Sequence, residues 1–355
     1  MLQTRQGSTK EEMLQNYIAE GASRGAAVVK QVMEQVPEDA LVRAHALRFD
    51  ADDSGIITVG PRAYRFHDNA LTQAASRADI PVSYVRTLQG RGTWGRELLA
   101  ENLTENYSNG FATDTKFLVR SVGGEARGFL SSKYRRMDSR PILDSLLTEF
   151  QKQGAVVCDG YAGDVRVSLT AILPRIFEPV HGDPVVFGVG FITSDFGRGA
   201  LELAKFALRI WCLNGQMSKG DIRKVHLGAR LTEDMNFRNQ TYELDTRTLA
   251  SATADVTRQL LSPQSVEKRS ERIADAAGRA VDPKQIRHIT RDLLTKADAM
   301  KVEEKFASAD IEDLPPGQNV WRLSNAFSWL ANQQEDGDKK LDLMQLSDTV
   351  MDKAA

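Results

Sequence analysis

The chain has 355 residues, of which 46 are Lys or Arg and 48 are Asp or Glu, so its formal net charge is −2 at pH 7. A hydrophobic fraction of 41% is ordinary for a globular protein, and the length suffices for one large domain with appendages or for two domains. The near-neutral charge excludes a globally basic coat for nucleic acid, so any site for a polyanion must be a local patch.

Neither a membrane-spanning segment nor an export signal is visible in the sequence. No apolar run approaches the roughly 18 to 20 residues that a spanning helix needs, and the first residues lack the basic-then-apolar layout of a signal peptide. Both cysteines, Cys158 and Cys212, lie in apolar stretches, which is typical of buried thiols in a reducing compartment. We therefore expect a cytoplasmic protein that makes no contact with membranes.

Helical and hairpin patterns alternate in the N-terminal third. Residues 1–40 are predicted to be helical, and Thr9 with Glu12 is one of two candidate capping pairs at the start. A hairpin is predicted over 47–59, where two apolar runs flank a polar turn. A mixed helical stretch then covers about 68–107.

The centre, from about 115 to 228, has the pattern of a β-rich core. Two strands on either side of the turn Gly123-Gly124 are predicted to form a hairpin. A helix is predicted over about 140–152, with Ser139 as its N-cap. Further strands are predicted at 155–158, 165–172, 185–192 and, with a helix as the alternative, 200–213.

From about residue 231 the sequence becomes helical and polar. Ser262-Pro263 and Asp282-Pro283 each place a capping side chain before a proline, which is typical of a helix start. A last helix carries Trp321 and its apolar neighbours. The final 25 residues hold six acids against three lysines and are predicted to form a mobile acidic tail.

These elements predict an α+β fold with a central, mostly antiparallel sheet, packed helices, an N-terminal helix and a helical C-terminal region. The expected division of the chain is an N-terminal helical segment at 1–40, an α+β core at 41–230, a helical C-terminal region at 231–330 and the acidic tail at 331–355.

Most catalytic and metal-binding signatures are absent from the sequence. There is no phosphate-binding P-loop, and Gly188-x-Gly190 lacks the third glycine of a dinucleotide fingerprint, so it favours a strand packed closely against another backbone. The calcium-like run that begins at Asp50 has Pro61 where a bidentate Glu is required. The histidines are scattered. We expect no cofactor and no metal, and a non-enzymatic role is favoured over a catalytic site assembled from dispersed residues.

The stretch from Lys116 to Arg140 holds seven basic residues but only two acids. Cations spaced along a surface bind phosphates by displacing counterions, and interleaved aromatic rings add base stacking. In a strand only one face can meet a ligand, and the alternative is a solvated edge strand guarded by charge, with Tyr134 in the core. The candidate nucleic-acid-binding residues, with one arginine from the glycine-containing loop 194–199, are Arg120, Arg127, Lys133, Tyr134, Arg135, Arg136, Arg140 and Arg198.

A second basic face is predicted on the helix that follows Pro283. Its basic side chains recur at i, i+3, i+4 and i+7, opposite an apolar face, and the alternative reading is an ordinary solvated face. This secondary face consists of Lys284, Arg287, His288 and Arg291.

Four stretches resemble, in order, the phage/plasmid-like proteins of unknown function, also called the domain of unknown function 932. They are Phe129-Leu130-Ser131-Ser132-Lys133-Tyr134-Arg135-Arg136-Met137-Asp138; Gly190 to Gly199, with Thr193 where that family usually has Asn; Arg209-Ile210-Trp211-Cys212-Leu213-Asn214-Gly215; and Asn319-Val320-Trp321-Arg322-Leu323-Ser324-Asn325-Ala326-Phe327. The resemblance covers about 110–335. It implies a phage, prophage or plasmid origin and a bacterial host cell, and it brings no catalytic residues.

The sequence thus favours a nucleic-acid-binding protein of a mobile element, with single-stranded DNA as the preferred partner and a role in recombination, replication or DNA protection. We expect a homo-oligomer, and the acidic tail is a candidate contact for host or phage replication proteins. One alternative is a host-directed interaction factor that inhibits a defence enzyme. Another is an enzyme with a dispersed site.

Overall fold

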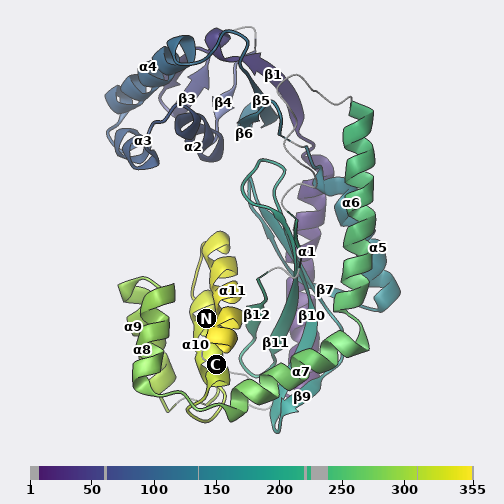
Figure 1. Cartoon of the computed structure of the whole chain (residues 1–355). Coiled ribbons are helices and arrows are strands. Elements are labelled where there is room, and N and C mark those ends of the chain that lie inside the picture. The colour runs from purple at the N-terminus through teal and green to yellow at the C-terminus, as the bar shows by residue number, and fades with distance from the viewer. Residues whose placement is uncertain are drawn as a thin grey trace.

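The strands of the protein form two sheets, and each sheet has its own covering helices (Figure 1). The computed structural model describes residues 8–59, 62–134, 136–219, 222–224, 239–309 and 311–353. We call the part built on the first sheet the upper lobe (residues 38–131) and the part built on the second sheet the lower lobe (residues 10–34 and 139–353). The expected α+β class with mostly antiparallel strands is confirmed, with two sheets in place of one.

The sheet of the upper lobe has six strands, of which only β4 and β6 run parallel. The expected hairpin at 116–131 is present, and Gly123 and Gly124 turn it with φ of +57° and +84°, values that favour glycine. A single 3₁₀ turn (Ala44–Ala46) links the first two strands. In spatial order the strands are β1 (Glu38–Arg43), β5 (Lys116–Val122), β6 (Glu125–Ser131), β4 (Arg65–Phe66), β3 (Gly55–Thr58) and β2 (Phe49–Asp52).

Three helices cover this sheet: α2 (Asp68–Arg77), α3 (Val82–Gln89) and α4 (Thr93–Asn109). Their apolar faces enclose an aromatic core around Tyr107, whose ring lies 5.4 Å from Phe49 and 5.5 Å from Phe129. The hydroxyl of Tyr107 donates to the carbonyl of Ala74 at 2.9 Å, so the buried polar end is satisfied. Burial raises the pKa of Tyr107.

The sheet of the lower lobe is antiparallel throughout. The ambiguous run at 200–213 is a strand, as favoured, because its two faces are both covered by apolar layers. In spatial order its strands are β12 (Asn214–Met217), β11 (Leu201–Arg209), β10 (Asp183–Thr193), β8 (Val167–Ile172) and β7 (Val156–Ala162), with β13 (Ile222–Lys224) paired to β11 and β9 (Phe177–Val180) paired to β10.

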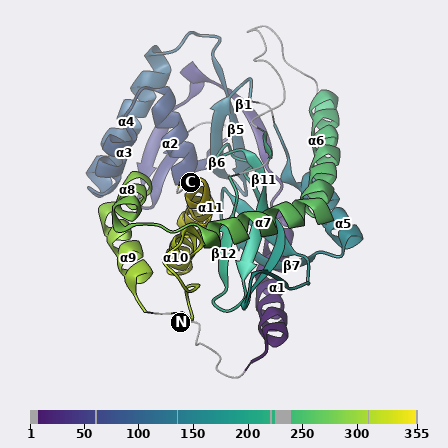
Figure 2. The same ribbon diagram turned by 60° about the horizontal axis from the view of Figure 1, so that its bottom comes forward.

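Helices lie on both faces of the lower sheet, and Figure 2 shows α7, α10 and α11 in front of it. One group packs with Val189, Phe191 and Leu203, and the other packs with Phe206 and Leu208. The first group is α1 (Lys10–Glu34), α5 (Ser139–Gln153) and α6 (Asn239–Leu260). The second is α7 (Pro263–Gly278), α10 (Val320–Asn332) and α11 (Gly337–Lys353), with α8 (Pro283–Leu293) and α9 (Lys296–Ala307) outside it.

Close backbone approach fixes two contacts of this sheet. A Cβ on Gly21 of α1 would lie 1.6 Å from the carbonyl oxygen of Cys158, so α1 can pack directly on β7 only with glycine there. A Cβ on Gly188 would lie 2.0 Å from the carbonyl oxygen of Ala171, as expected for a strand packed against another backbone.

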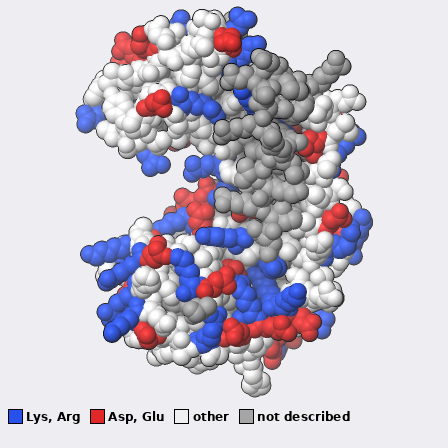
Figure 3. Space-filling model, in the orientation of Figure 1, with Lys and Arg blue, Asp and Glu red and all other residues white. Residues whose placement is uncertain are grey.

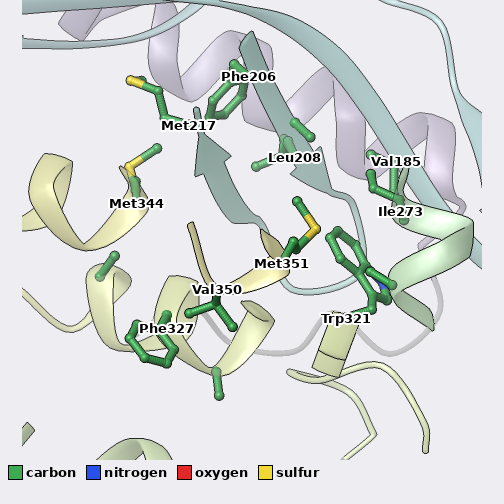
Figure 4. Packing of buried hydrophobic residues seen from close by; sticks show 14 of the residues in the cluster. Val185, Phe206, Leu208, Met217, Ile273, Trp321, Phe327, Met344, Val350 and Met351 are labelled. Carbon is green, nitrogen blue, oxygen red and sulfur yellow. The ribbon is translucent and has the colours of Figure 1, made fainter. Parts of the chain in front are cut away.

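The largest apolar cluster lies between the lower sheet and the C-terminal helices (Figure 4). Phe206 and Met217 from the sheet, Met344 and Met351 from α11 and Trp321 from α10 all contribute to it. Each fully buried side chain of this size stabilises the fold by about 1.5–3 kcal/mol relative to exposure.

Three local expectations are wrong. The segment expected to be a mobile acidic tail contains helix α11 at Gly337–Lys353, which packs on α10 through Leu341, Met344 and Val350, because apolar residues recur at helical spacing between the acids. The N-terminal helix ends at Glu34, and 38–43 is strand β1. The N-cap of α5 is Asp138, so Ser139 is the first residue of that helix.

Candidate nucleic-acid interface

The basic segment 116–140 lies where the two lobes meet, and its first arginine is enclosed by acids. Arg120 on β5 has 1% of its side chain exposed. Its Nε donates to Asp39 Oδ1 at 2.8 Å, its Nη2 donates to Asp138 Oδ1 at 2.6 Å, and its Nη1 donates to the carbonyl of Asp195 at 2.8 Å. A guanidinium with these partners ties β1, β5 and the loop after β10 together and has no donor facing a phosphate.

A second set of hydrogen bonds extends this network to the carboxyl group of Asp195. The backbone N–H of Ser139 donates to Asp195 Oδ1 at 3.0 Å, the Ser139 hydroxyl also donates to it, and the Ser139 and Thr193 hydroxyl oxygens lie 3.2 Å apart. Burial, which disfavours the carboxylate, raises the pKa of Asp195 to about 6, although the neighbouring Arg120 opposes the shift. The carboxyl therefore holds the start of α5 against the loop after β10.

Two further candidates are also neutralised within the fold. Arg127, 11% exposed, donates from Nε to Glu125 Oε2 at 2.8 Å and from Nη1 to Gln35 Oε1 at 2.7 Å. The Nε of Arg136 lies 3.3 Å from Asp39 Oδ2, and its guanidinium carbon lies 5.3 Å from the centre of the Tyr242 ring.

The remaining candidate residues come from different elements. Tyr134 is half-buried, and burial raises its pKa to about 12. Lys133, Arg140 and Arg198 are exposed and come from the loop after β6, the first turn of α5 and the loop after β10. Arg135 lies outside the described residues. The segment is thus chiefly a junction between the lobes.

The secondary basic face on α8 is arranged as predicted. The helix begins at Pro283 behind a capping box of Asp282 and Gln285, and Ile286 and Ile289 are buried on its inner side. The side chains of the outer face are all exposed: Lys284, Arg287, His288 and Arg291.

The acids close to this face form their contacts elsewhere, since Asp282 accepts from the backbone N–H groups of Lys284 and Gln285. The acid of the same helix, Asp292, is paired with Lys353 of α11. Throughout the described ranges, no ion pair engages Lys284, Arg287 or Arg291. Three cations on two turns of one helix, with solvent on their side, form a surface that can contact successive phosphates.

Figure 3 shows Lys and Arg side chains gathered at the left of the lower lobe, where Figure 1 places α8 and α9. Lys296 and Lys301 of α9 are exposed as well. The surface is hollowed between this region and the upper lobe, and we call this hollow the cleft. Helices α8 and α9 thus border the cleft on its lower side.

Across the cleft from α8 lie α3 and the start of α4 (Figure 1), and each of these two helices carries an exposed aromatic residue. Trp94 is 52% exposed and Tyr84 is 40% exposed. The guanidinium of Arg91 lies 5.6 Å from the centre of the Trp94 ring. Sequence reasoning missed these residues, and the nearest signal was the break between helices at Gly90-Arg91-Gly92, two residues before Trp94.

Another polar network joins the hairpin of β11 and β12 to α10. Arg209 Nε donates to Asp183 Oδ1 at 2.5 Å, and Trp321 Nε1 donates to Asp183 Oδ2 at 2.7 Å. Asn214 Nδ2 donates to the carbonyl of Asp313 at 2.9 Å. Burial raises the pKa of the Cys212 thiol, which makes it a poor nucleophile. We assign this network to packing.

The described residues contain no group of three or more His, Cys, Asp or Glu side chains that could hold a metal ion. Nor does any described helix combine the length and the apolar character that crossing a bilayer requires. Comparison of the chain with protein families, with curated proteins and with solved structures finds no match.

Proposed function

We propose that this protein binds nucleic acid in the cleft, with the basic face of α8 as the contact for the phosphate backbone. The observation that carries the proposal is the set of three exposed cations at Lys284, Arg287 and Arg291, none of which forms an ion pair within the described residues. The capping box and the buried Ile286 and Ile289 fix the helix that presents them. A preformed row of cations gives affinity through counterion release without any ordering of the helix on binding.

A near-neutral protein is compatible with this role because the charges are segregated. The acids around the basic segment 116–140 are paired with buried or half-buried arginines, such as Arg120 and Arg127. The cations of α8 are exposed, and the helix lies on the side of the lower lobe where Lys and Arg side chains gather (Figures 1 and 3). A polyanion would meet this region first, since long-range attraction depends on the local potential more than on the net charge.

The four sequence elements that resemble the phage/plasmid-like proteins support a mobile-element origin as part of the proposal. Arg120 bridges the first two elements, because Asp138 from the first and the carbonyl of Asp195 from the second both accept from it. The third and fourth are in direct contact, since Asn214 donates to the carbonyl of Asn325 at 3.4 Å. In a phage or plasmid context the preferred ligand is single-stranded DNA handled during recombination, replication or protection.

The test is fluorescence anisotropy with a labelled single strand at salt concentrations between about 50 and 200 mM. We expect binding at low salt and a steep loss as salt rises. The triple variant Lys284→Gln, Arg287→Gln, Arg291→Gln should reduce the slope of log K against log salt by about 2, since each phosphate contact contributes about 0.7 on a single strand.

A matched control removes three exposed lysines from other helices: Lys30→Gln on α1, Lys152→Gln on α5 and Lys268→Gln on α7. This variant has the same net charge as the α8 triple variant and should keep most of the affinity and the salt slope. Equal losses in the two variants would mean that only net charge matters. The absence of binding by the unaltered protein at 50 mM salt would refute the proposal.

A further inference from the structure

Two aromatic side chains of the upper lobe are exposed to an extent that the packing of the fold does not explain. Trp94 is 52% exposed and Tyr84 is 40% exposed, whereas Val85 and Leu88 of the same corner are buried. Large apolar rings at a surface are most often recognition sites when they gather in one place. We call residues 84–94 the aromatic corner.

A short turn connects the two exposed rings of this corner. Helix α3 ends at Gln89, and Gly90 and Arg91 continue it as a turn in which they donate to the carbonyls of Arg86 and Leu88 at 3.1 and 3.0 Å. Gly92 then turns the chain with φ of +74°. Trp94 follows in the first turn of α4, and the Arg91 guanidinium lies 5.6 Å from its ring centre.

The corner is held rigidly. A Cβ on Gly95 would lie 2.2 Å from the carbonyl oxygen of Leu88, so α3 and α4 are in backbone contact at this point. Val85 and Leu88 anchor the corner in the core of the upper lobe. An aromatic platform that is already fixed loses little conformational freedom when a ligand stacks on it.

We propose that the aromatic corner stacks unpaired nucleobases and thereby makes single strands the preferred ligand of the cleft. This inference rests on the proposed nucleic-acid function. A base presents a flat π-face to Tyr84 or to the face of Trp94 that Arg91 does not cover, and the Arg91 guanidinium over the ring adds a cation for a phosphate. In a duplex the base faces are stacked inside the helix and cannot reach the rings.

The two sides of the cleft then have complementary tasks. The basic face of α8 on the lower side contacts phosphates of either a single strand or a duplex, because phosphates are exposed in both. The aromatic corner on the upper side engages bases, which only a single strand offers. The predicted preference for single strands therefore resides in the upper lobe, and the general affinity resides in the lower lobe.

The experiment compares an oligo-dT strand with a duplex of equal length, at one salt concentration, for Trp94→Ala, Trp94→Phe and Tyr84→Ala. Trp94→Ala should weaken binding of oligo-dT about tenfold and change duplex binding less than about twofold. Trp94→Phe should restore most of the loss because an aromatic face remains. The matched control is Trp211→Phe, which alters another exposed Trp, 38% exposed, at the turn after β11, and it should leave both affinities unchanged.

Intrinsic fluorescence gives a second readout. Oligo-dT should quench part of the tryptophan emission of the unaltered protein, and Trp94→Phe should remove that quenching while Trp211→Phe keeps it. If Trp94→Ala and Trp94→Phe both bind oligo-dT as tightly as the unaltered protein, and the α8 triple variant still loses binding, the stacking proposal is overturned and the proposed function stands. If the unaltered protein binds neither oligo-dT nor duplex, the proposed function itself fails.

Discussion

The basic segment 116–140 and helix α8 look alike in sequence, but the structure uses their charges in opposite ways. Arg120 and Arg127 of the segment have 1% and 11% of their side chains exposed and are paired with acids. The cations of α8 are exposed, and no ion pair within the described ranges engages Lys284, Arg287 or Arg291. A cluster of cations in sequence therefore predicts a binding surface only where its acidic partners are absent in space.

The difference follows from the elements that carry the charges. β5 is flanked by β1 and β6 inside a sheet, so a cation on it is enclosed by neighbouring segments and must be neutralised. α8 lies at the edge of the lower lobe and covers its neighbours with only one face. An amphipathic helix on a surface leaves its polar face in solvent, where unpaired cations are tolerated without cost.

The largest effect should come from breaking the buried network. Arg120→Met keeps much of the volume of the side chain but leaves Asp39 and Asp138 without this partner. We expect the free energy of unfolding to fall by about 3 kcal/mol, because the carbonyl of Asp195 and the partly buried carboxylate of Asp39 lose a donor inside the fold. Urea unfolding measured by circular dichroism gives the value.

The control for this prediction is Arg140→Met, which alters an exposed arginine of the same segment. Its free energy of unfolding should stay within about 0.5 kcal/mol of the unaltered protein. If Arg120→Met were as stable as Arg140→Met, Arg120 would contribute little to the junction between the lobes.

A smaller effect should appear in the pH dependence of stability. The pKa of Asp195 is raised to about 6 in the folded protein from its ordinary value of 3.8, so the folded state binds this proton more tightly than the unfolded state. The contribution to stability is complete below about pH 4 and is lost as pH rises through 6. Arg120, Asp138 and Ser139 are the groups that face this carboxyl.

Asp195→Asn tests this linkage because the amide oxygen can still accept from Ser139 while the charge is gone. The unaltered protein should lose on the order of 2 kcal/mol of unfolding free energy from this group between pH 4 and pH 7, and the variant should not show this loss. The α8 triple variant serves as the control and should parallel the unaltered protein across this range. A difference between Asp195→Asn and the unaltered protein that does not change with pH would contradict the assigned cause of the shift.

Sequence patterns predicted most local elements but not the contacts between them. The start of α8 was readable because Asp282, Pro283 and Gln285 act within one helical turn. The partners of Arg120 were not readable, since Asp39 and Asp195 lie 81 and 75 residues away along the chain. Local capping rules carry no information about which distant strands and loops will meet.

The same limit explains the error at the C-terminus and the residues that were missed. An excess of acids over the last 25 residues concealed the apolar spacing that buries Leu341, Met344 and Val350 in α11. The exposure of Trp94 depends on the contact between α3 and α4 at Gly95, which no single pattern in the sequence encodes. Composition indicates which residues are polar, whereas tertiary packing decides which are exposed.

The smallest effect is expected from the exposed cations of the basic segment 116–140. Lys133→Gln with Arg140→Gln removes two positive charges near the junction and should change oligo-dT affinity by less than about twofold. Arg140 shares a surface pocket with Asp138 and Asp144, so a phosphate there would meet acids as well as the arginine.

On α8, the double variant Lys284→Gln, Arg291→Gln removes the same charge and should weaken oligo-dT binding about tenfold or more at low salt. Anisotropy titrations of the two double variants at equal salt compare the regions directly. Similar losses from both would mean that the nucleic acid reaches across to the junction between the lobes, and the binding surface would then have to include Lys133 and Arg140.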